Sequence, residues 1–165
     1  TWKGFREAAF ESMATTAAIL LIVAGAKIFG KAITLYRIPQ DVSMFIGQAI
    51  DTPLAFILVV SLVLLLMGLV FEALSMVLIM TPVLLPAAMG MRFDPIWFGV
   101  FMVIMVECAL ITPPVGLNLY VIQSVAKARL TEVAGGVLPF LLLMFLTVVI
   151  LYLVPDLALY IPFKL

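Results

Sequence analysis

The residues that could carry chemistry in this sequence stand where long apolar segments are interrupted. Glu72 follows the stretch Gly68–Phe71, and Thr112 begins the stretch Thr112–Gly116, which contains successive prolines. A helix broken at membrane depth exposes backbone carbonyls and amides that lipid cannot satisfy, at a cost of several kcal/mol per group. Such breaks persist only inside protein or beside a wet cavity, and secondary transporters use them to bind ions and anions.

Two ionisable side chains lie close to these interruptions. Glu72 ends the first, and Glu107 precedes the second inside an apolar run. An ionisable residue within a membrane segment indicates a functional site, where it would handle an ion or a proton. The alternative is a structural ion pair, with Lys27 or Arg92 as the partner. Asn118, just after the second interruption, is either part of the site or a polar contact between helices.

Composition places the chain in a bilayer. Hydrophobic residues make up 66% of its 165 residues and charged residues 11%, whereas soluble domains have roughly 45–50% and about 25%. Acidic and basic residues balance, so no basic face for nucleic acid is expected. Without histidine, and with Cys108 as the single cysteine, a zinc, haem or disulfide site is not expected. We predict an all-α integral membrane protein that is not an enzyme, since no nucleophile–base pair is apparent.

The first half of the chain predicts one long helix and two short ones. The apolar segment over about 15–36 suffices for one crossing at ~20 residues. Pro39 is expected to end it, followed by an interfacial connector over 41–51. Two apolar pieces, 53–67 and 72–89, then flank the first interruption. A piece of fifteen residues reaches only ~22 Å of a ~30 Å core, which favours a hairpin that turns inside the membrane over two crossings.

The second half predicts a broken helix and a final span. A polar turn over 90–95 precedes an apolar run over 96–126. The prolines of the second interruption remove amide donors and divide this run into two arms. A polar loop over 127–132 follows, and the last span is predicted from 137 to 154, where Pro155 ends it.

An ordered set of motifs carries a more specific signal than any one of them. The motifs are Gly68-Leu69-Val70-Phe71-Glu72, Thr81-Pro82-Val83-Leu84-Leu85-Pro86, Phe93-Asp94-Pro95-Ile96-Trp97-Phe98-Gly99, Glu107, Leu110-Ile111-Thr112-Pro113-Pro114-Val115-Gly116-Leu117-Asn118-Leu119-Tyr120, Leu138-Pro139-Phe140 and Val154-Pro155-Asp156. Together they resemble the second half of the large permease subunit of tripartite ATP-independent periplasmic (TRAP) transporters, the DctM-like family. The chain departs from the family pattern at Glu72, where Asp is common, and at Ala109, where Gly is common.

The resemblance implies an elevator-type transporter built from two inverted repeats. Each repeat holds a re-entrant helical hairpin and a discontinuous helix, and residues 1–165 would form the C-terminal repeat. The expected parts are a scaffold helix and connector at 1–51, a re-entrant hairpin at 52–90, a discontinuous helix at 95–126 and a final transmembrane helix at 136–155.

The resemblance also implies a site where the hairpin tip meets the break near the midplane. Na⁺ would bind there as the coupling ion, with no other cofactor. Its expected ligands are backbone carbonyls and one hydroxyl, from Gly68, Val70, Thr112, Pro113 and Gly116. The solute carboxylate would bind beside the ion, near Glu72, Ser75 and Asn118, since the helix that starts after the break presents its N-terminus there.

The implied function is import of carboxylate solutes, such as C4-dicarboxylates or other organic and sugar acids, driven by Na⁺. A periplasmic solute-binding protein would deliver the solute. The other expected partners are a small permease subunit, the N-terminal half of the large permease and the lipid bilayer, and the expected location is the bacterial or archaeal inner membrane. Two alternatives stay open: a Na⁺/dicarboxylate symporter of related elevator fold that needs no binding protein, and a non-transporting membrane scaffold subunit.

Overall fold

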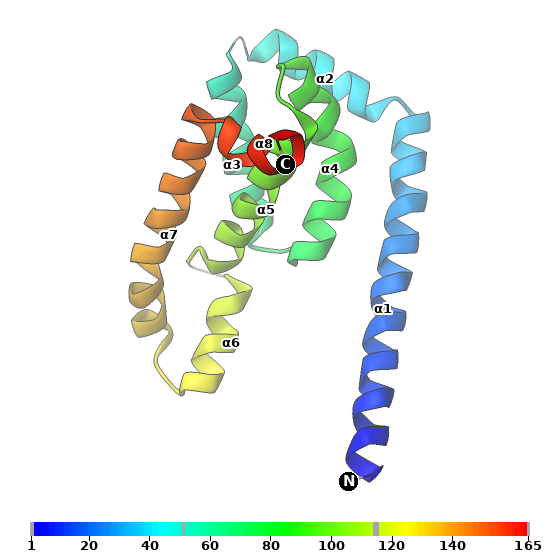
Figure 1. The fold of residues 1–165 in the computed structure, drawn as a ribbon, viewed down its shortest axis with the longest axis vertical. Helices are drawn as coiled ribbons and strands as arrows, with labels where there is room; N and C mark the ends of the chain where they lie inside the picture. Colours follow the sequence, from blue (N-terminus) through cyan, green and yellow to red (C-terminus); the bar gives the residue numbers. More distant parts are fainter. Residues whose placement is uncertain (1, 51, 114–115, 165) are drawn as a thin grey trace.

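The computed structural model describes residues 2–50, 52–113 and 116–164, and most of that length is helical. Within these ranges no strand is present, in agreement with the predicted all-α class. The helices, in chain order, are α1 (Trp2–Leu35), α2 (Ile38–Ala49), α3 (Pro53–Met67), α4 (Ala73–Gly90), α5 (Pro95–Ile111), α6 (Leu117–Ala126), α7 (Leu130–Leu153) and α8 (Asp156–Lys164) (Figure 1).

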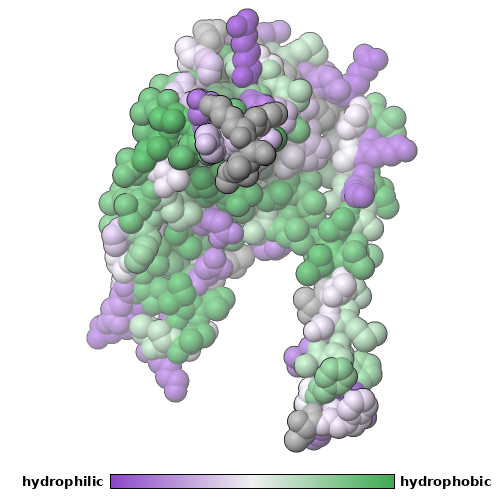
Figure 2. Space-filling model, viewed as in Figure 1, coloured by the Kyte–Doolittle hydropathy of each residue, from purple (hydrophilic) through white to green (hydrophobic). Residues whose placement is uncertain are grey.

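The helices fall into long and short ones. Among the described residues, α1, α4 and α7 are long and apolar enough to cross a membrane, while α3 and α5 are apolar but shorter. The turn between α3 and α4 lies at about the level of the α5–α6 break, well above the lower end of α1 and the α6–α7 turn (Figure 1). Hydrophilic residues gather at the upper edge and lower tips, with apolar surface between them (Figure 2). This distribution is typical of a protein surrounded by lipid.

Helix α5 forms the centre of the molecule. Helices α3, α4 and α7 all pack against it, whereas α3 and α4 contact each other much less. The Trp97 ring stacks on Phe93 at a centroid distance of 4.7 Å and on Phe101 at 5.7 Å. The buried side chains of α5 are Trp97, Phe98, Phe101, Met102, Met105, Val106, Cys108, Ala109 and Leu110.

One buried hydrogen bond joins α5 to α7. The indole Nε1–H of Trp97 donates to the carbonyl of Leu151, at 2.9 Å. In a continuous helix this carbonyl would accept the amide of residue 155, but that residue is Pro155 and has no N–H. The indole therefore satisfies a carbonyl that the proline leaves free.

Replacing Trp97 by phenylalanine should lower the free energy of unfolding by roughly 1–3 kcal/mol, since the Leu151 carbonyl would stay buried without a donor. Thermal unfolding in detergent measures this change. Trp2→Phe is the matched control, because Trp2 is 79% exposed and should unfold like the parent protein. An equal effect of both substitutions would contradict the role given to the indole.

Two helices begin where the sequence predicts, at a proline preceded by a capping residue. Thr52 Oγ1 accepts the amide of Ala55 at 3.2 Å, and α3 starts at Pro53. The carboxylate of Asp94 accepts the amides of Ile96 and Trp97 at 2.8 and 3.3 Å, and α5 starts at Pro95. A proline in the first helical turn loses no helical hydrogen bond, because the amides of that turn have no acceptor within the helix.

Other boundaries differ from prediction. Pro39 does not merely end the first helix: it lies in the first turn of α2, which begins at Ile38 and covers most of the expected connector. The final helix begins at Leu130, not near 136, because Glu132 accepts the amide of Arg129 at 3.2 Å and starts it. Pro139 therefore lies inside α7, and α7 takes in residues 130–132 of the expected polar loop, while 127–129 remain outside the helix.

Three helices are followed by a basic residue in the left-handed conformation. Within the described ranges, the non-glycine residues with positive φ are Arg37, Arg92 and Lys127, at 57°, 66° and 51°. Glycine or asparagine usually takes this position after a helix. A cation there has a compensating benefit, since it lies at the negative end of the helix dipole.

Candidate functional site

The turn between α3 and α4 presents free carbonyl groups. The amides of Val70 and Phe71 both donate to the Met67 carbonyl, at 3.0 and 2.9 Å, which closes the turn tightly. Among the described residues, no backbone amide donates to the carbonyls of 68–71. These four oxygens are therefore available to a ligand or to another part of the protein.

Glu72 holds the start of α4. Its carboxylate accepts the Ser75 amide at 2.7 Å, the Ser75 hydroxyl at 2.6 Å and the Leu74 amide at 3.0 Å. A negative charge at a helix N-terminus is favourable because the first amides there have no partner within the helix. The carboxylate thus fixes where the turn ends and α4 begins.

Replacing Glu72 by alanine should lower the free energy of unfolding by roughly 0.5–2 kcal/mol, the usual cost of losing an N-cap. Glu72→Asp should lose much less, since Asp is among the preferred capping residues. Thermal unfolding in detergent compares the two. Equal destabilisation by Asp and Ala would show that the carboxylate does not act as a cap.

The second interruption divides α5 from α6. The Thr112 hydroxyl donates to the Cys108 carbonyl at 2.6 Å, and the Thr112 amide donates to Ala109 at 3.3 Å. Pro114 has no N–H, so the Leu110 carbonyl lacks the donor that a continuous helix would supply. A Cβ added to Gly116, at φ 22°, would lie 2.9 Å from this Leu110 oxygen. The backbone after the break therefore returns close to the end of α5.

Pro114 and Val115 belong to the predicted break but lie outside the described residues. Pro113 is described and forms part of a turn between the ends of the two helices. Asn118 lies half-buried in the first turn of α6, where free amides and the helix dipole favour an anion.

The α3–α4 turn contacts the end of α5 at Gly68. A Cβ added to Gly68 would lie 3.0 Å from the carbonyl carbon of Ala109 and 3.1 Å from its Cα, and would overlap its Cβ. Ala109 lies in the last turn of α5. The free carbonyls of the turn are thus held next to the end of the broken helix, and glycine is the residue that permits this approach.

The structure brings several of the predicted site residues into contact. Gly68 and the end of α5 meet, and Glu72 contacts Ser75. The side chain of Val70 is 78% exposed, so Val70 can contribute to the site only through its backbone carbonyl. Sequence reasoning missed Ala109 and Leu110. The spacing could have identified Leu110, because a proline frees the carbonyl four residues before it.

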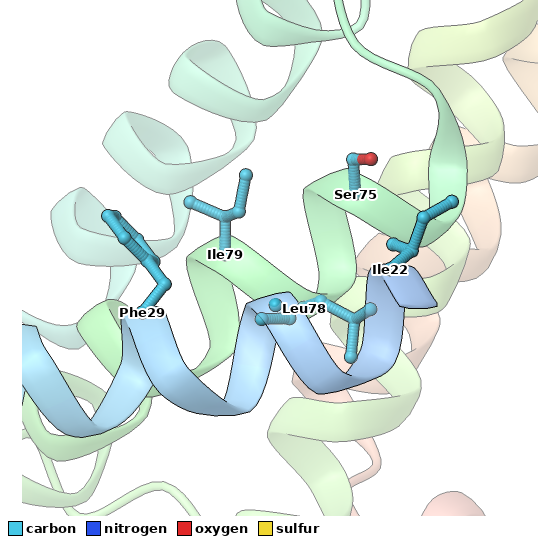
Figure 3. A pocket seen from close by; sticks show the side chains of 7 residues that line it. Ile22, Phe29, Ser75, Leu78 and Ile79 are labelled. Carbon is cyan, nitrogen blue, oxygen red and sulfur yellow. The ribbon is translucent and has the colours of Figure 1, made fainter. Parts of the chain in front are cut away.

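Ser75 also lines a cavity between α1 and α4 of about 230 Å³. Figure 3 shows Ile22 and Phe29 of α1 and Leu78 and Ile79 of α4 around it. Apart from Ser75, the lining is apolar, and the Ser75 hydroxyl already donates to Glu72. This cavity does not suit a carboxylate.

The alternative reading of the two glutamates as ion-pair partners finds no support among the described residues. Neither Glu72 nor Glu107 forms an ion pair there; the pair that is present joins Arg129 and Glu132 at 3.6 Å. Glu107 of α5 is exposed and lies beside Ala73 and Leu74, the first residues of α4.

Comparison with known proteins places the chain in one family. Residues 1–157 match the family described as "Tripartite ATP-independent periplasmic transporter, DctM component". The chain is 32% identical over 162 residues to the sialic acid TRAP transporter large permease protein SiaM of Vibrio cholerae, covering 98% of the chain and 38% of that relative. It is 36% identical over 152 residues to the C4-dicarboxylate TRAP transporter large permease protein DctM of Pseudomonas aeruginosa, covering 92% and 36%.

A third relative is named for a different solute. The chain is 35% identical over 150 residues to the 2,3-diketo-L-gulonate TRAP transporter large permease protein YiaN of Escherichia coli, covering 91% of the chain and 35% of that relative. The chain therefore spans between 35% and 38% of the length of these three relatives. With these matches and its membrane-length helices, the chain belongs to the DctM component family of tripartite ATP-independent periplasmic transporters and is a multi-pass protein of the inner membrane.

Proposed function

We propose that this chain forms the C-terminal repeat of a Na⁺-coupled TRAP large permease that imports carboxylate solutes. The observation that carries the proposal is the contact of Gly68 with Ala109, which brings the α3–α4 turn against the end of the broken helix. In this proposal α3 and α4 are a re-entrant hairpin, and α5 and α6 are the discontinuous helix of an elevator-type fold.

The oxygen atoms around this contact suit Na⁺. The carbonyls of 68–71 accept no backbone amide among the described residues, and Pro114 deprives the Leu110 carbonyl of its helical donor. The Thr112 hydroxyl donates its hydrogen bond to the Cys108 carbonyl, so its oxygen lone pairs stay available to a cation. Such neutral oxygens are hard ligands, and unwound carbonyls coordinate Na⁺ in secondary transporters. Gly68, Val70, Thr112, Pro113 and Gly116 are the proposed ligands.

The solute carboxylate would bind beside the cation, at the start of α6. The free amides there and the Asn118 side chain favour an anion. Glu72 is already engaged with Ser75 and Leu74, and direct contact with a carboxylate would place like charges together. We therefore assign Glu72 and Ser75 to the site as the pair that holds the hairpin tip in position.

The proposed partners follow from the family and from the shape of this chain. The space-filling view shows a wide opening between the lower part of α1 and the remaining helices (Figure 2). Because the chain spans only part of the length of its relatives, we propose that the N-terminal half of the large permease occupies this side. A small permease subunit and a periplasmic solute-binding protein would complete the transporter.

Uptake into proteoliposomes tests the proposal. The assembled transporter would be supplied with labelled acidic solutes, an inward Na⁺ gradient and the solute-binding protein. We expect uptake that requires both the gradient and the binding protein. Uptake that needs Na⁺ but no binding protein would favour a symporter of related fold. No uptake and no Na⁺ binding would favour a scaffold subunit.

A further inference from the structure

A groove of about 470 Å³ lies between α3 and α7. Its walls are apolar except for Ser61 and the Tyr152 hydroxyl. Leu58 and Leu62 of α3 and Val149 of α7 are each about half exposed or more, at 61%, 58% and 51%. A continuous apolar groove of this size is within the roughly 300–1,000 Å³ range of ligand sites.

A second hollow, which contains a basic side chain, borders the groove at Tyr152. This cleft, of about 350 Å³, is lined by Arg92, Asp94, Trp97 and others, and Tyr152 lines both hollows. Arg92 is exposed and forms no ion pair among the described residues. Asp94 lines the same cleft, but it forms no ion pair with Arg92, and its carboxylate accepts the amides of Ile96 and Trp97, so the guanidinium stays available to a phosphate.

The position of this cleft corresponds to a membrane boundary. The start of α3, the end of α7 and the α4–α5 turn that carries Arg92 lie at the same end of the molecule (Figure 1). Hydrophilic residues gather at this end (Figure 2). Tyr and Trp side chains are enriched at the level of lipid headgroups, and Arg attracts their phosphates.

We propose that the α3–α7 groove and the Arg92 cleft together bind one anionic phospholipid. An acyl chain lies along Leu58, Leu62 and Val149, and the phosphate lies at the Arg92 guanidinium. The charge is what selects this occupant, because an apolar helix in the groove would have no group to pair with Arg92. A guanidinium can bind phosphate through two parallel hydrogen bonds. This inference is independent of the Na⁺ site and of the solute.

Lipid titration of the assembled, delipidated transporter tests the site. Phosphatidylglycerol would be added in detergent and bound lipid counted by native mass spectrometry, with phosphatidylcholine as the comparison lipid. We expect Arg92→Asn to weaken phosphatidylglycerol binding about 10-fold or more, since one charge-assisted bond is worth roughly that much. Asn tolerates the left-handed backbone of this position, so the fold should be kept.

Two further variants separate the headgroup from the acyl chain. Leu62→Trp fills the groove from an exposed position and should reduce binding of both lipids. Arg37→Asn is the matched control, because Arg37 is also left-handed and follows a helix but does not line either hollow; binding should be unchanged.

Three results would overturn the inference. The first is equal phosphatidylglycerol affinity in the parent protein, Arg92→Asn and Leu62→Trp. The second is displacement of the lipid by millimolar inorganic phosphate, which would indicate a simple anion site. The third is cross-linking of a cysteine placed at Leu62 to another protein segment, which would show that protein covers the groove.

Discussion

Replacing Gly68 by valine should abolish Na⁺-driven uptake while leaving the protein in the membrane. A Cβ at this position meets the backbone of Ala109, at 3.0 Å from its carbonyl carbon and 3.1 Å from its Cα. Backbone atoms in the middle of a packed interface cannot move aside as a flexible side chain can. The α3–α4 turn must therefore withdraw from α5, and a displacement of about 1 Å can cost roughly 100-fold in rate where geometry carries function.

Uptake into proteoliposomes, normalised to the amount of folded transporter, measures this effect. Gly99→Ala is the matched control, because an added Cβ there meets nothing within 4 Å, and it should transport normally. Gly68→Ala should reduce uptake without abolishing it. The double variant Gly68→Ala with Ala109→Gly should regain part of the lost uptake, because the Ala109 Cβ that the new Cβ would overlap is removed. Normal uptake by Gly68→Val would show that the tip contact is not needed.

Replacing Thr112 by alanine should raise the Na⁺ concentration needed for half-maximal uptake by about 10-fold or more. The hydroxyl oxygen is one of the proposed cation ligands, and interactions of this kind with a charged group are worth roughly 1.5–3 kcal/mol. Thr112→Ser should retain near-normal Na⁺ activation because it keeps the hydroxyl. Expression should change little, because the lost hydrogen bond to Cys108 is one of several at the end of α5.

Na⁺ activation curves of solute uptake provide the measurement. Thr147→Ala is the matched control: its hydroxyl donates to the carbonyl four residues earlier, at 2.9 Å to Leu143, but it lies on the exposed side of α7. An unchanged Na⁺ dependence in Thr112→Ala, or an equal shift in Thr147→Ala, would remove Thr112 from the ion site.

Sequence reasoning succeeded where a local signal decides the backbone. Two apolar helices are predicted at 53–67 and 72–89, and α3 and α4 span 53–67 and 73–90. Thr52-Pro53 and Asp94-Pro95 mark helix starts because a capping oxygen and a proline both favour that position. Pro113 and Pro114 mark the break because neither can donate to the preceding turn.

The same local signals misled at Pro39 and at the start of α7. The first helix ends before Pro39 as predicted, but proline is equally suited to the first turn of a new helix, and α2 begins there at Ile38. Residues 127–129 form a loop as predicted, but the final helix begins at Leu130 instead of near 136, because Glu132 caps the amide of Arg129. In both cases the sequence permits two readings, and the packing of the helix on its neighbours decides between them.

The contacts that assemble the site could not be read from one sequence. The approach of Gly68 to Ala109 joins residues far apart in the chain, and no periodicity specifies it. The same holds for the hydrogen bond from Trp97 to Leu151. Each contact includes a residue that can be recognised in the sequence: a small residue in the first, and a carbonyl left without a donor by a proline in the second. Which residue it meets depends on how the helices cross.

The Trp97–Leu151 hydrogen bond also has a mechanical consequence. Sliding α5 along α7 would break the hydrogen bond from the Trp97 indole to the Leu151 carbonyl. Because Pro155 has no N–H, no helical amide would replace the indole as donor. We therefore expect the two helices to resist sliding along each other. Along α1 the situation is different: the described contacts with α4 are apolar, no hydrogen bond crosses them, and Gly30 meets the Pro82 ring at an ordinary 3.9 Å from its added Cβ. We therefore expect displacement of α1 along α4 to meet a lower energy barrier than displacement of α5 along α7.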